Sequence, residues 1–235
     1  MEQEQWGIVG TGNLGGAILT QLARVKRFIR FYHRDAHKAE AIAKAYPGQN
    51  SISREELGNL DFLILALPAD QIAPFVRDLL DSGVSLADVT CINMATVLDT
   101  SELKREFPTL RWLGMKFMGH SVDLRERGGG LFVTEQNEGL WREQEKAIRL
   151  FEQIGKVVVD KEAVVAEVNQ LATRAAVKAA LELEQAVRAG GYRQEYAERA
   201  LLSLAPEVMR AYVTGTMGHF ARQIVEQMRG TDRQE

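Results

Sequence analysis

The sequence predicts an α/β fold: a doubly wound, mostly parallel sheet covered by helices, followed by a small all-helical C-terminal domain. Up to about residue 160, short β-rich runs alternate with amphipathic helical stretches, the pattern that builds a parallel sheet. A glycine-rich turn joins the first of these runs to the first helical stretch. Beyond residue 160 the β-rich runs stop, and apolar residues recur at helical spacing.

The glycine-rich turn has the pattern GxGxxG between an apolar strand and a helix start. It reads Gly10-Thr11-Gly12-Asn13-Leu14-Gly15. In this pattern the first glycine permits a tight turn, the second lets backbone N–H groups approach a pyrophosphate, and the third lets the helix pack closely on the strand. The helix N-terminus favours the negative charge of the phosphates. The turn therefore predicts a Rossmann-type dinucleotide-binding domain with these six residues at the cofactor; the alternative is a glycine-rich turn in another α/β protein.

Seven runs rich in apolar and β-branched residues are predicted as strands, with helices between them. They are residues 6–9, 28–32, 62–67, 89–94, 111–115, 131–134 and 157–159. Ser53 and Asp99 are each followed three positions later by a glutamate, which is typical of a capping box, so we expect helices to begin there. Right-handed crossovers would bring the carboxyl ends of the strands to one edge of the sheet, where such sheets bind ligands.

The C-terminal part is predicted to contain three helices. Residues 162–189 form the first, which Gly190 and Gly191 end; residues 193–204 form the second, and Pro206 suits the first turn of a third that runs to Met228. We therefore expect a dinucleotide-binding domain at 1–160, a helical domain at 161–230 and a polar tail at 231–235. Three helices make a thin core, so the helical domain is expected to form a homodimer.

Composition and charge exclude several classes of protein. With 235 residues and 46% hydrophobic content, the chain can bury a core without disulfides. The single cysteine, Cys91, lies in an apolar run and indicates a buried bystander in a reducing compartment. A net charge of −3 argues against nucleic acid or a membrane surface as partner. The polar first five residues and the absence of a long apolar run predict a cytoplasmic protein, and the four histidines form no metal-ligand motif.

The segment after the second predicted strand indicates which dinucleotide binds. A domain that binds NAD usually places an acid there, which accepts hydrogen bonds from the ribose hydroxyls. Here the strand ends at His33, followed by Arg34 and, one helical turn on, Lys38, which together would surround the 2′-phosphate of NADP. NADP is therefore predicted, and NAD is the less favoured cofactor. Two alternatives stay open: a solvated basic loop, and Asp35 turned toward the ribose.

Two further strand ends are predicted to line the cofactor site. Ala66, Leu67 and Pro68 close the third long strand, and because proline cannot continue a paired strand, the chain turns there. Met94 and Ala95 follow the next strand, where small neighbours would admit a flat ring. For these two residues an ordinary exit from the strand is the alternative.

The segment after the fifth predicted strand carries the strongest candidates for substrate chemistry. Lys116, His120 and Ser121 place a cation, an imidazole and a hydroxyl at the edge of the sheet where ligands bind. Histidine exchanges a proton near neutral pH, so His120 is predicted as the proton donor, or else as a wall of the pocket. Lys116 is predicted to hold a substrate carboxylate and Ser121 to contact the substrate.

The long predicted helix adds three polar residues. Asn169, Thr173 and Arg174 lie at helical spacing and can share a face toward the cleft. Asn169 and Thr173 are predicted substrate contacts, and Arg174 is predicted to clamp a substrate carboxylate. A solvated or interface arginine is the alternative for Arg174.

The glycine turn and the basic segment resemble the pyrroline-5-carboxylate reductase family. This family is part of a wider 6-phosphogluconate dehydrogenase-like group in which a Rossmann domain precedes a helical dimerisation domain. Residues 7–15 are similar to the family's opening, residues 33–39 resemble its Asn-Arg-x-x-x-Lys-Ala, and residues 65–68 its Ala-Val-Lys-Pro without the lysine. The resemblance implies that NADP is the cofactor, that Arg34 contacts its phosphate and that the helical domain forms a dimer.

Other segments depart from that family. Residues 118–122 replace its Met-Pro-Asn-Thr-Pro, which puts His120 and Ser121 in the Asn and Thr places. Its Ser-Gly-Ser-Gly-Pro-Ala-Tyr falls on residues 168–174, where none of its hydroxyls stands in place. Gly119 and His120 resemble the Gly-His-Pro turn of prephenate dehydrogenase, and Asn169 matches the asparagine of the Lys-x-x-Asn in hydroxyacid dehydrogenases.

Together these features predict an NADP-dependent oxidoreductase that moves hydride between nicotinamide and a small-molecule substrate with a C=N or C=O bond. The alternative from another class is a non-catalytic sensor or accessory protein that binds NADP on a reductase scaffold.

Overall fold

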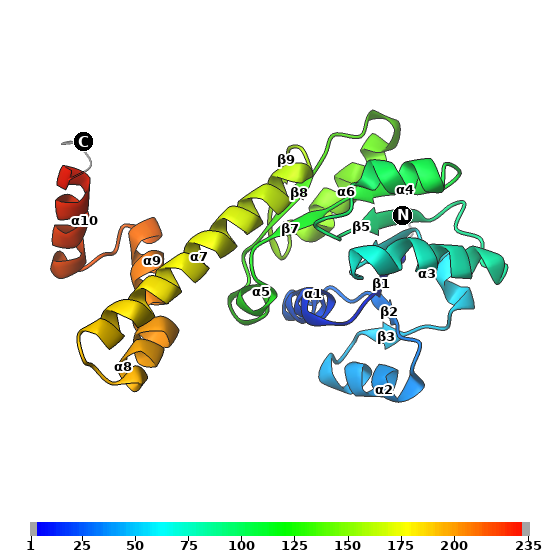
Figure 1. The fold of residues 1–235 in the computed structure, drawn as a ribbon. Coiled ribbons are helices and arrows are strands. Elements are labelled where there is room, and N and C mark those ends of the chain that lie inside the picture. Colours follow the sequence, from blue (N-terminus) through cyan, green and yellow to red (C-terminus); the bar gives the residue numbers. More distant parts are fainter. Residues whose placement is uncertain (1–3, 232–235) are drawn as a thin grey trace. The chain divides into compact units, whose positions relative to one another are not determined.

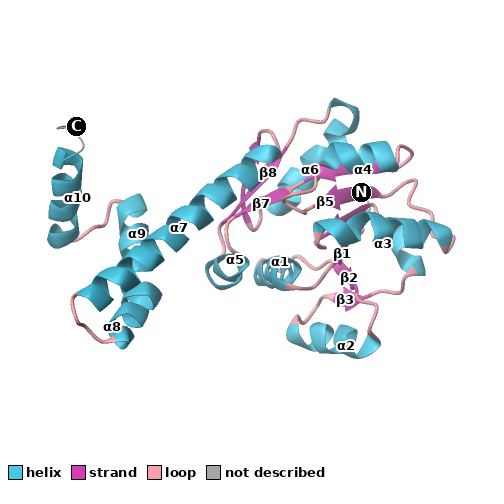
Figure 2. Cartoon of the chain, in the orientation of Figure 1, coloured by secondary structure: helices cyan, strands magenta, loops and turns pink. Residues whose placement is uncertain are grey.

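The computed structural model describes residues 4–231 of the chain. Two compact units make it up, Met1–Gln170 and Leu171–Glu235. Figure 1 colours the chain along the sequence and labels many of its helices and strands, and Figure 2 distinguishes helix, strand and loop by colour. The predicted polar tail, 231–235, lies outside the described residues except for residue 231, where the last helix ends.

Six parallel strands form the main sheet of the first unit, in the order β3-β2-β1-β4-β5-β6. Their bounds are β1 (Trp6–Val9), β2 (Arg30–Tyr32), β3 (Asn50–Ser51), β4 (Phe62–Leu65), β5 (Thr90–Asn93) and β6 (Arg111–Gly114). This order is that of a Rossmann fold, with the topological switch between β1 and β4, so the predicted fold class is confirmed. The strand β3 was not predicted, because it consists of two exposed polar residues that show no strand pattern.

A second sheet of three strands follows the main one. It contains β7 (Lys116–Met118), β8 (Gly130–Thr134) and β9 (Gly155–Val159), with β7 antiparallel to β8 and β8 parallel to β9. The predicted strands 131–134 and 157–159 thus lie in this sheet and not at the edge of the main one. Only Met115 separates β6 from β7, which is too short for the crossover that a parallel neighbour needs. Lys116, which was expected in a loop, is therefore the first residue of a strand.

Helices cover both faces of the main sheet (Figure 1). The helices of the first unit before α7 are α1 (Asn13–Arg24), α2 (Ala36–Ala45), η1 (Glu55–Asn59), α3 (Ala69–Asp81), α4 (Thr100–Glu106), α5 (Ser121–Arg127), η2 (Glu138–Leu140) and α6 (Trp141–Phe151). Successive strand residues point to opposite faces, so Ile8 and Ile64 pack in one buried cluster with α1, while Val9 and Leu65 pack in another with α3. The carboxyl ends of β1 and β4 are held between these two layers.

Both predicted helix starts occur, although one helix is of a different type. At α4 the Asp99 carboxylate accepts a hydrogen bond from the Ser101 N–H (2.7 Å), as expected of an N-cap. At the other start, Ser53 N–H donates to the Glu56 carboxylate (2.7 Å) and Glu56 N–H donates to the Ser53 hydroxyl (3.4 Å), which completes a capping box. The helix that follows is the short 3₁₀ helix η1, because β4 begins only a few residues later.

The second unit is helical. The helix α7 (Ala163–Ala189) begins in the first unit, and α8 (Gln194–Arg199), η3 (Ala200–Leu204), α9 (Ala205–Thr214) and α10 (His219–Thr231) follow it. Gly191, in the turn after α7, has φ +70°. The helix therefore ends at the glycine pair, as predicted. The prediction that a single third helix runs to Met228 is wrong. Gly215 takes φ +72° and ends α9, so α10 is a separate helix.

Candidate cofactor-binding site

The glycine turn between β1 and α1 has the geometry of a phosphate-binding loop. Gly10 has φ +91°, and a Cβ there would overlap the Ala66 carbonyl. Gly12 caps α1, and no atom lies within 4 Å of the position that a Cβ would take there. At Gly15 a Cβ would overlap the Gly10 carbonyl oxygen, so the backbone of α1 is in close contact with the turn. The N-terminus of α1 therefore borders open space into which a phosphate fits.

A cleft of about 970 Å³ opens beside this turn, at the carboxyl ends of β1, β2 and β4. Its lining includes most of the predicted cofactor residues: Gly10, Thr11, Gly12, His33, Arg34, Lys38, Ala66, Leu67 and Pro68. The volume is at the upper end of the range for small-molecule sites. The cleft spans the topological switch of the sheet, which is where such folds bind dinucleotides.

The end of the cleft at β2 presents the cations of Arg34 and Lys38, and the acid of the same segment, Asp35, is engaged. The Asp35 carboxylate caps α2 by accepting a hydrogen bond from the Lys38 N–H (3.2 Å), so it is not turned toward a ribose. Nδ1 of His33 lies within hydrogen-bond distance of both the N–H (3.0 Å) and the carbonyl oxygen (3.2 Å) of Asp35. Arg34 and the Lys38 side chain are exposed at the cleft. This arrangement suits a 2′-phosphate better than two ribose hydroxyls.

Sequence reasoning missed the other residues that line the cleft. They are Val9, Tyr32, Ala41, Ile42, Arg54, Asp70, Gln71, Pro74, Phe75 and Asp78. Among them, Arg54 donates to both a carboxylate oxygen and the carbonyl oxygen of Asp78, each at 2.6 Å. No motif marks these residues, because they come from β1, β2, α2, α3 and the loop before η1, and the fold alone brings them to one place.

Five predicted cofactor residues do not line the cleft. They are Asn13, Leu14, Gly15, Met94 and Ala95. Gly15 lies under the turn, where its missing side chain lets α1 approach. Met94 and Ala95 are 1% and 8% exposed at the end of β5, next to β4. Their place at the edge of the sheet is as predicted, but their side chains are part of the core.

The turn after β7 carries His120 and Ser121. His120 is exposed and caps α5, with its Nδ1 accepting a hydrogen bond from the Val122 N–H (3.3 Å). Ser121 is half-buried in the first turn of α5. The Asn169 side chain donates to the Phe117 carbonyl oxygen (3.4 Å), which ties the start of α7 to β7. The structure therefore brings Asn169 to the strand that leads to His120, although none of the three residues lines the cleft.

Lys116 has a different environment from the one expected. Its side chain is 1% exposed, and its ammonium group contacts the carbonyl oxygens of Ala95 and Leu98 (2.8 Å each) and the Glu162 carboxylate (3.3 Å). Three protein oxygens therefore meet the three hydrogens of the ammonium group. Burial lowers the pKa of Lys116, and the Glu162 carboxylate opposes this effect. A buried ammonium held in this way is not placed to bind a substrate carboxylate.

The remaining predicted substrate residues, Thr173 and Arg174, belong to the second unit. Both are exposed on α7, and their roles stay predictions. Cys91 is fully buried in β5, and burial raises the pKa of its thiol to about 12, so it has the environment of a core residue.

Two kinds of feature are missing from residues 4–231. No group of three or more His, Cys, Asp or Glu side chains is placed to hold a metal ion in this part of the chain. In the same range, no helix has both the length and the apolar character that crossing a bilayer requires.

Comparison with known proteins agrees with this geometry. Residues 5–92, which contain the glycine turn and the basic segment, match the family described as NADP oxidoreductase coenzyme F420-dependent. No curated protein matches the sequence significantly.

Several solved structures share the fold. A pyrroline-5-carboxylate reductase from Coxiella burnetii has a TM-score of 0.72 and 18% identity, over 99% of this chain and 93% of that one. The pyrroline carboxylate reductase of Plasmodium falciparum with NADP bound has a TM-score of 0.65 and 16% identity, over 97% and 84% of the two chains. An imine reductase from Myxococcus stipitatus in complex with NADP⁺ has a TM-score of 0.65 and 16% identity, over 90% and 75%. The chain therefore shares the fold of these three proteins.

Proposed function

We propose that the protein is an NADP-dependent oxidoreductase that transfers hydride between nicotinamide and a small C=N or C=O substrate. The observation that carries the proposal is the cleft in which the glycine turn at Gly12 meets Arg34 and Lys38, with Asp35 engaged elsewhere. The open space at Gly12 fits a pyrophosphate, and the basic end fits a 2′-phosphate. When bound, the cofactor supplies the hydride chemistry, while the chain binds it, orients it and excludes water.

In this proposal the loop around His120 supplies the proton that accompanies the hydride. Because Nδ1 of His120 accepts a hydrogen bond from the Val122 N–H, Nε2 is the ring atom that remains to donate a proton. Ser121 and Asn169, next to this loop and to β7, are the proposed substrate contacts from the first unit. The substrate roles predicted for Thr173 and Arg174 in the second unit stay predictions. Lys116 is not included, because its ammonium group is buried.

The function is tested by measuring substrate-dependent oxidation of NADPH across a panel of cyclic imines, ketones and ketoacids, beginning with pyrroline-5-carboxylate. Turnover of one class of substrate, saturable in both substrate and NADPH, is the expected result. Loss of turnover in a His120→Gln variant that still binds NADPH would identify the proton donor. If NADPH binds and no imine or carbonyl compound is turned over, the oxidoreductase proposal is contradicted for that panel.

A non-catalytic NADP-binding sensor is the second candidate. One observation favours it: Lys116, which was predicted to hold a substrate carboxylate, is enclosed by Ala95, Leu98 and Glu162 and not presented to a substrate. Tight binding of NADPH without turnover, together with a change in oligomeric state or protease sensitivity on binding, would distinguish a sensor from an enzyme.

The choice of NADP over NAD is expected to depend on Arg34. Replacing Arg34 with alanine removes a charged partner of the 2′-phosphate, so the Kd for NADPH should rise roughly 10- to 100-fold. The Kd for NADH should change little, because NADH lacks that phosphate. Titration of nicotinamide fluorescence measures both constants. Lys44→Ala, an exposed change at the far end of α2, is the matched control and should leave both constants unaltered.

We further propose that the second unit forms a homodimer with a second copy of the chain. Within residues 171–230 only Ala197 is buried, whereas many large apolar side chains are exposed, including Leu202 at 81% and Val213 at 84%. A helical unit of this size cannot be stable with so little buried surface, so its apolar side chains need a partner.

The dimer is tested by sedimentation equilibrium. The expected mass is about twice the chain mass of 26.3 kDa, and a Leu202→Glu/Val213→Glu variant should shift it toward the monomer. Val159→Glu, at a half-exposed apolar position in the first unit, is the control and should remain dimeric. A wild-type protein that stays monomeric at all concentrations would contradict the proposal.

A further inference from the structure

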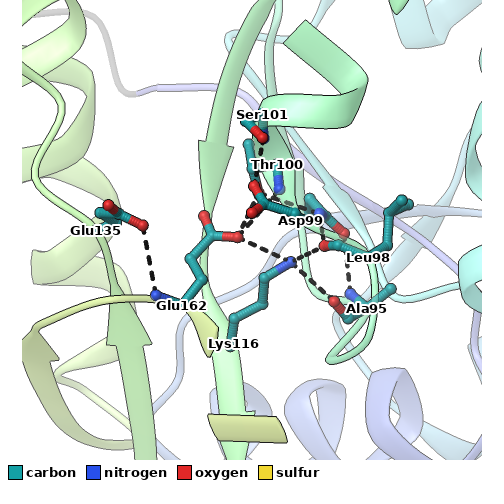
Figure 3. A network of polar contacts seen from close by, with 9 residues as sticks. Ala95, Leu98, Asp99, Thr100, Ser101, Lys116, Glu135 and Glu162 are labelled. Atoms are coloured by element: carbon teal, nitrogen blue, oxygen red, sulfur yellow. Dashed lines mark hydrogen bonds and ion pairs between the residues drawn. The ribbon is translucent and has the colours of Figure 1, made fainter. Parts of the chain in front are cut away.

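The buried ammonium of Lys116 closes a loop that follows β5 (Figure 3). Its contacts with the carbonyl oxygens of Ala95 and Leu98 join the first and last residues of loop 95–98. The Leu98 carbonyl also accepts a hydrogen bond from the Asn93 side chain (2.8 Å), whose oxygen in turn accepts from the Ala95 N–H (3.0 Å). The loop is thus held at both ends by side chains and not only by its own backbone.

The Glu162 carboxylate anchors Lys116 from the start of α7. Its Oε2 accepts hydrogen bonds from the Thr100 N–H (3.2 Å) and the Thr100 hydroxyl (2.8 Å), and it lies 3.3 Å from Nζ of Lys116. Gly114 on β6 makes room for it, because a Cβ at Gly114 would overlap the carboxylate. Figure 3 shows these residues converging from β7, α4 and the segment before α7.

Stability alone does not account for this pair. Taking an ammonium and a carboxylate out of water is costly, and buried ion pairs contribute little compared with apolar side chains of the same volume. An apolar residue at position 116 would fill the space, but it could not bind two carbonyl oxygens. What the ammonium adds, and an apolar side chain would not, is a direct bridge between the Ala95 and Leu98 carbonyl oxygens, beside the contacts that the Asn93 side chain makes with the same two residues.

The loop lies where the nicotinamide half of the cofactor is expected. β5 pairs with β4, and the Met94 N–H donates to the Leu65 carbonyl (3.2 Å), so loop 95–98 stands beside the loop 66–68 that lines the cleft. A dinucleotide crosses the sheet edge at the switch point. If its 2′-phosphate is held by Arg34 beyond β2 and its pyrophosphate by the start of α1, its other half would extend over β4 toward β5.

We propose that Lys116, anchored by Glu162, is a positioning residue that holds loop 95–98 in the conformation required by the nicotinamide half of the cofactor. This inference rests on the proposed NADP function. It assigns Lys116 to the cofactor through the loop and not through direct contact with the substrate.

The test compares two ligands: NADPH, and adenosine 2′,5′-bisphosphate, which has the 2′-phosphate but no nicotinamide. In a Lys116→Met variant the Kd for NADPH should rise roughly tenfold, whereas the Kd for the bisphosphate should stay within about twofold of wild type. A general loss of structure would weaken both ligands together. Lys104→Met, an exposed change on α4, is the control and should affect neither.

A double variant keeps the test valid if the single variant is too unstable. Lys116→Met leaves Glu162 buried without its cation, and the melting temperature should fall by roughly 10 °C. Adding Glu162→Gln removes the unpaired charge and should recover much of that loss while leaving the carbonyl oxygens of loop 95–98 without the ammonium. The selective loss of NADPH affinity should persist in the double variant.

Three results would overturn the inference. Equal weakening of both ligands, or unchanged NADPH affinity in the folded double variant, would show that Lys116 does not position the nicotinamide half. If the wild-type protein binds neither ligand, the proposed function fails and this inference fails with it.

Discussion

Replacing Gly12 with aspartate is expected to weaken NADPH binding by at least about a hundredfold while leaving the protein as stable as wild type or slightly more stable. The structure supports the first expectation because Gly12 caps α1 and open space, not protein, occupies the position of its Cβ. A carboxylate at position 12 would occupy the space that a phosphate needs. Its negative charge would also repel the phosphates of the cofactor. The second expectation follows because aspartate is a good N-cap and complements the helix macrodipole.

The Gly12→Asn variant separates shape from charge. Asparagine has nearly the same size as aspartate and is an equally good N-cap, so a loss common to both variants measures the blocked space. The additional loss in Gly12→Asp measures the repulsion of the phosphates. Fluorescence titration gives the affinities and thermal melting gives the stability. NADPH affinity equal to wild type in Gly12→Asp would mean that the pyrophosphate does not bind at the start of α1.

Gly15→Ala should have the opposite pattern, a large loss of stability. A Cβ at Gly15 would overlap the Gly10 carbonyl oxygen, and neither the turn nor α1 has room to retreat, because both are packed against β1 and β4. Overpacking of this kind costs about 1–3 kcal/mol or more, which lowers the melting temperature by roughly 5–10 °C. Because the added Cβ displaces α1, whose N-terminus borders the phosphate site, NADPH binding is expected to weaken as well.

Gly16→Ala is the matched control, one position along the same helix. The nearest atoms to a Cβ at Gly16 are the ends of two side chains, the Arg125 guanidinium at 3.1 Å and the Tyr46 hydroxyl at 3.2 Å, which can move aside. Alanine also favours a helix over glycine by up to about 1 kcal/mol. We therefore expect Gly16→Ala to melt near the wild-type temperature. Equal melting temperatures for Gly15→Ala and wild type would show that Gly15 is not in close contact with the Gly10 carbonyl oxygen.

The parts of the site that the sequence predicted are those determined by local backbone chemistry. The glycines of the turn act on their own backbone and on the adjacent helix, so their spacing is visible in the sequence. The basic segment at Arg34 and Lys38 follows directly from the end of β2 and a capped helix. In both places a strand, a turn and a helix succeed one another within a few residues, and the chemistry lies at the junction.

The parts that sequence reasoning missed depend on contacts between distant elements. Lys116 was expected to meet a substrate at the edge of the sheet where ligands bind, but it is buried beside Glu162, a partner that comes from the segment before α7. Arg54 reaches the cleft only because β3 pairs with β2, and β3 itself shows no strand pattern. The break at Gly215 was missed because apolar periodicity resumes on its far side in α10.

The most direct test of the account is a titration of the purified wild-type protein with NADPH and with NADH, followed by nicotinamide fluorescence. The cleft at Gly12, Arg34 and Lys38 predicts micromolar binding of NADPH and at least roughly tenfold weaker binding of NADH. Binding of neither dinucleotide, or tighter binding of NADH than of NADPH, would contradict it.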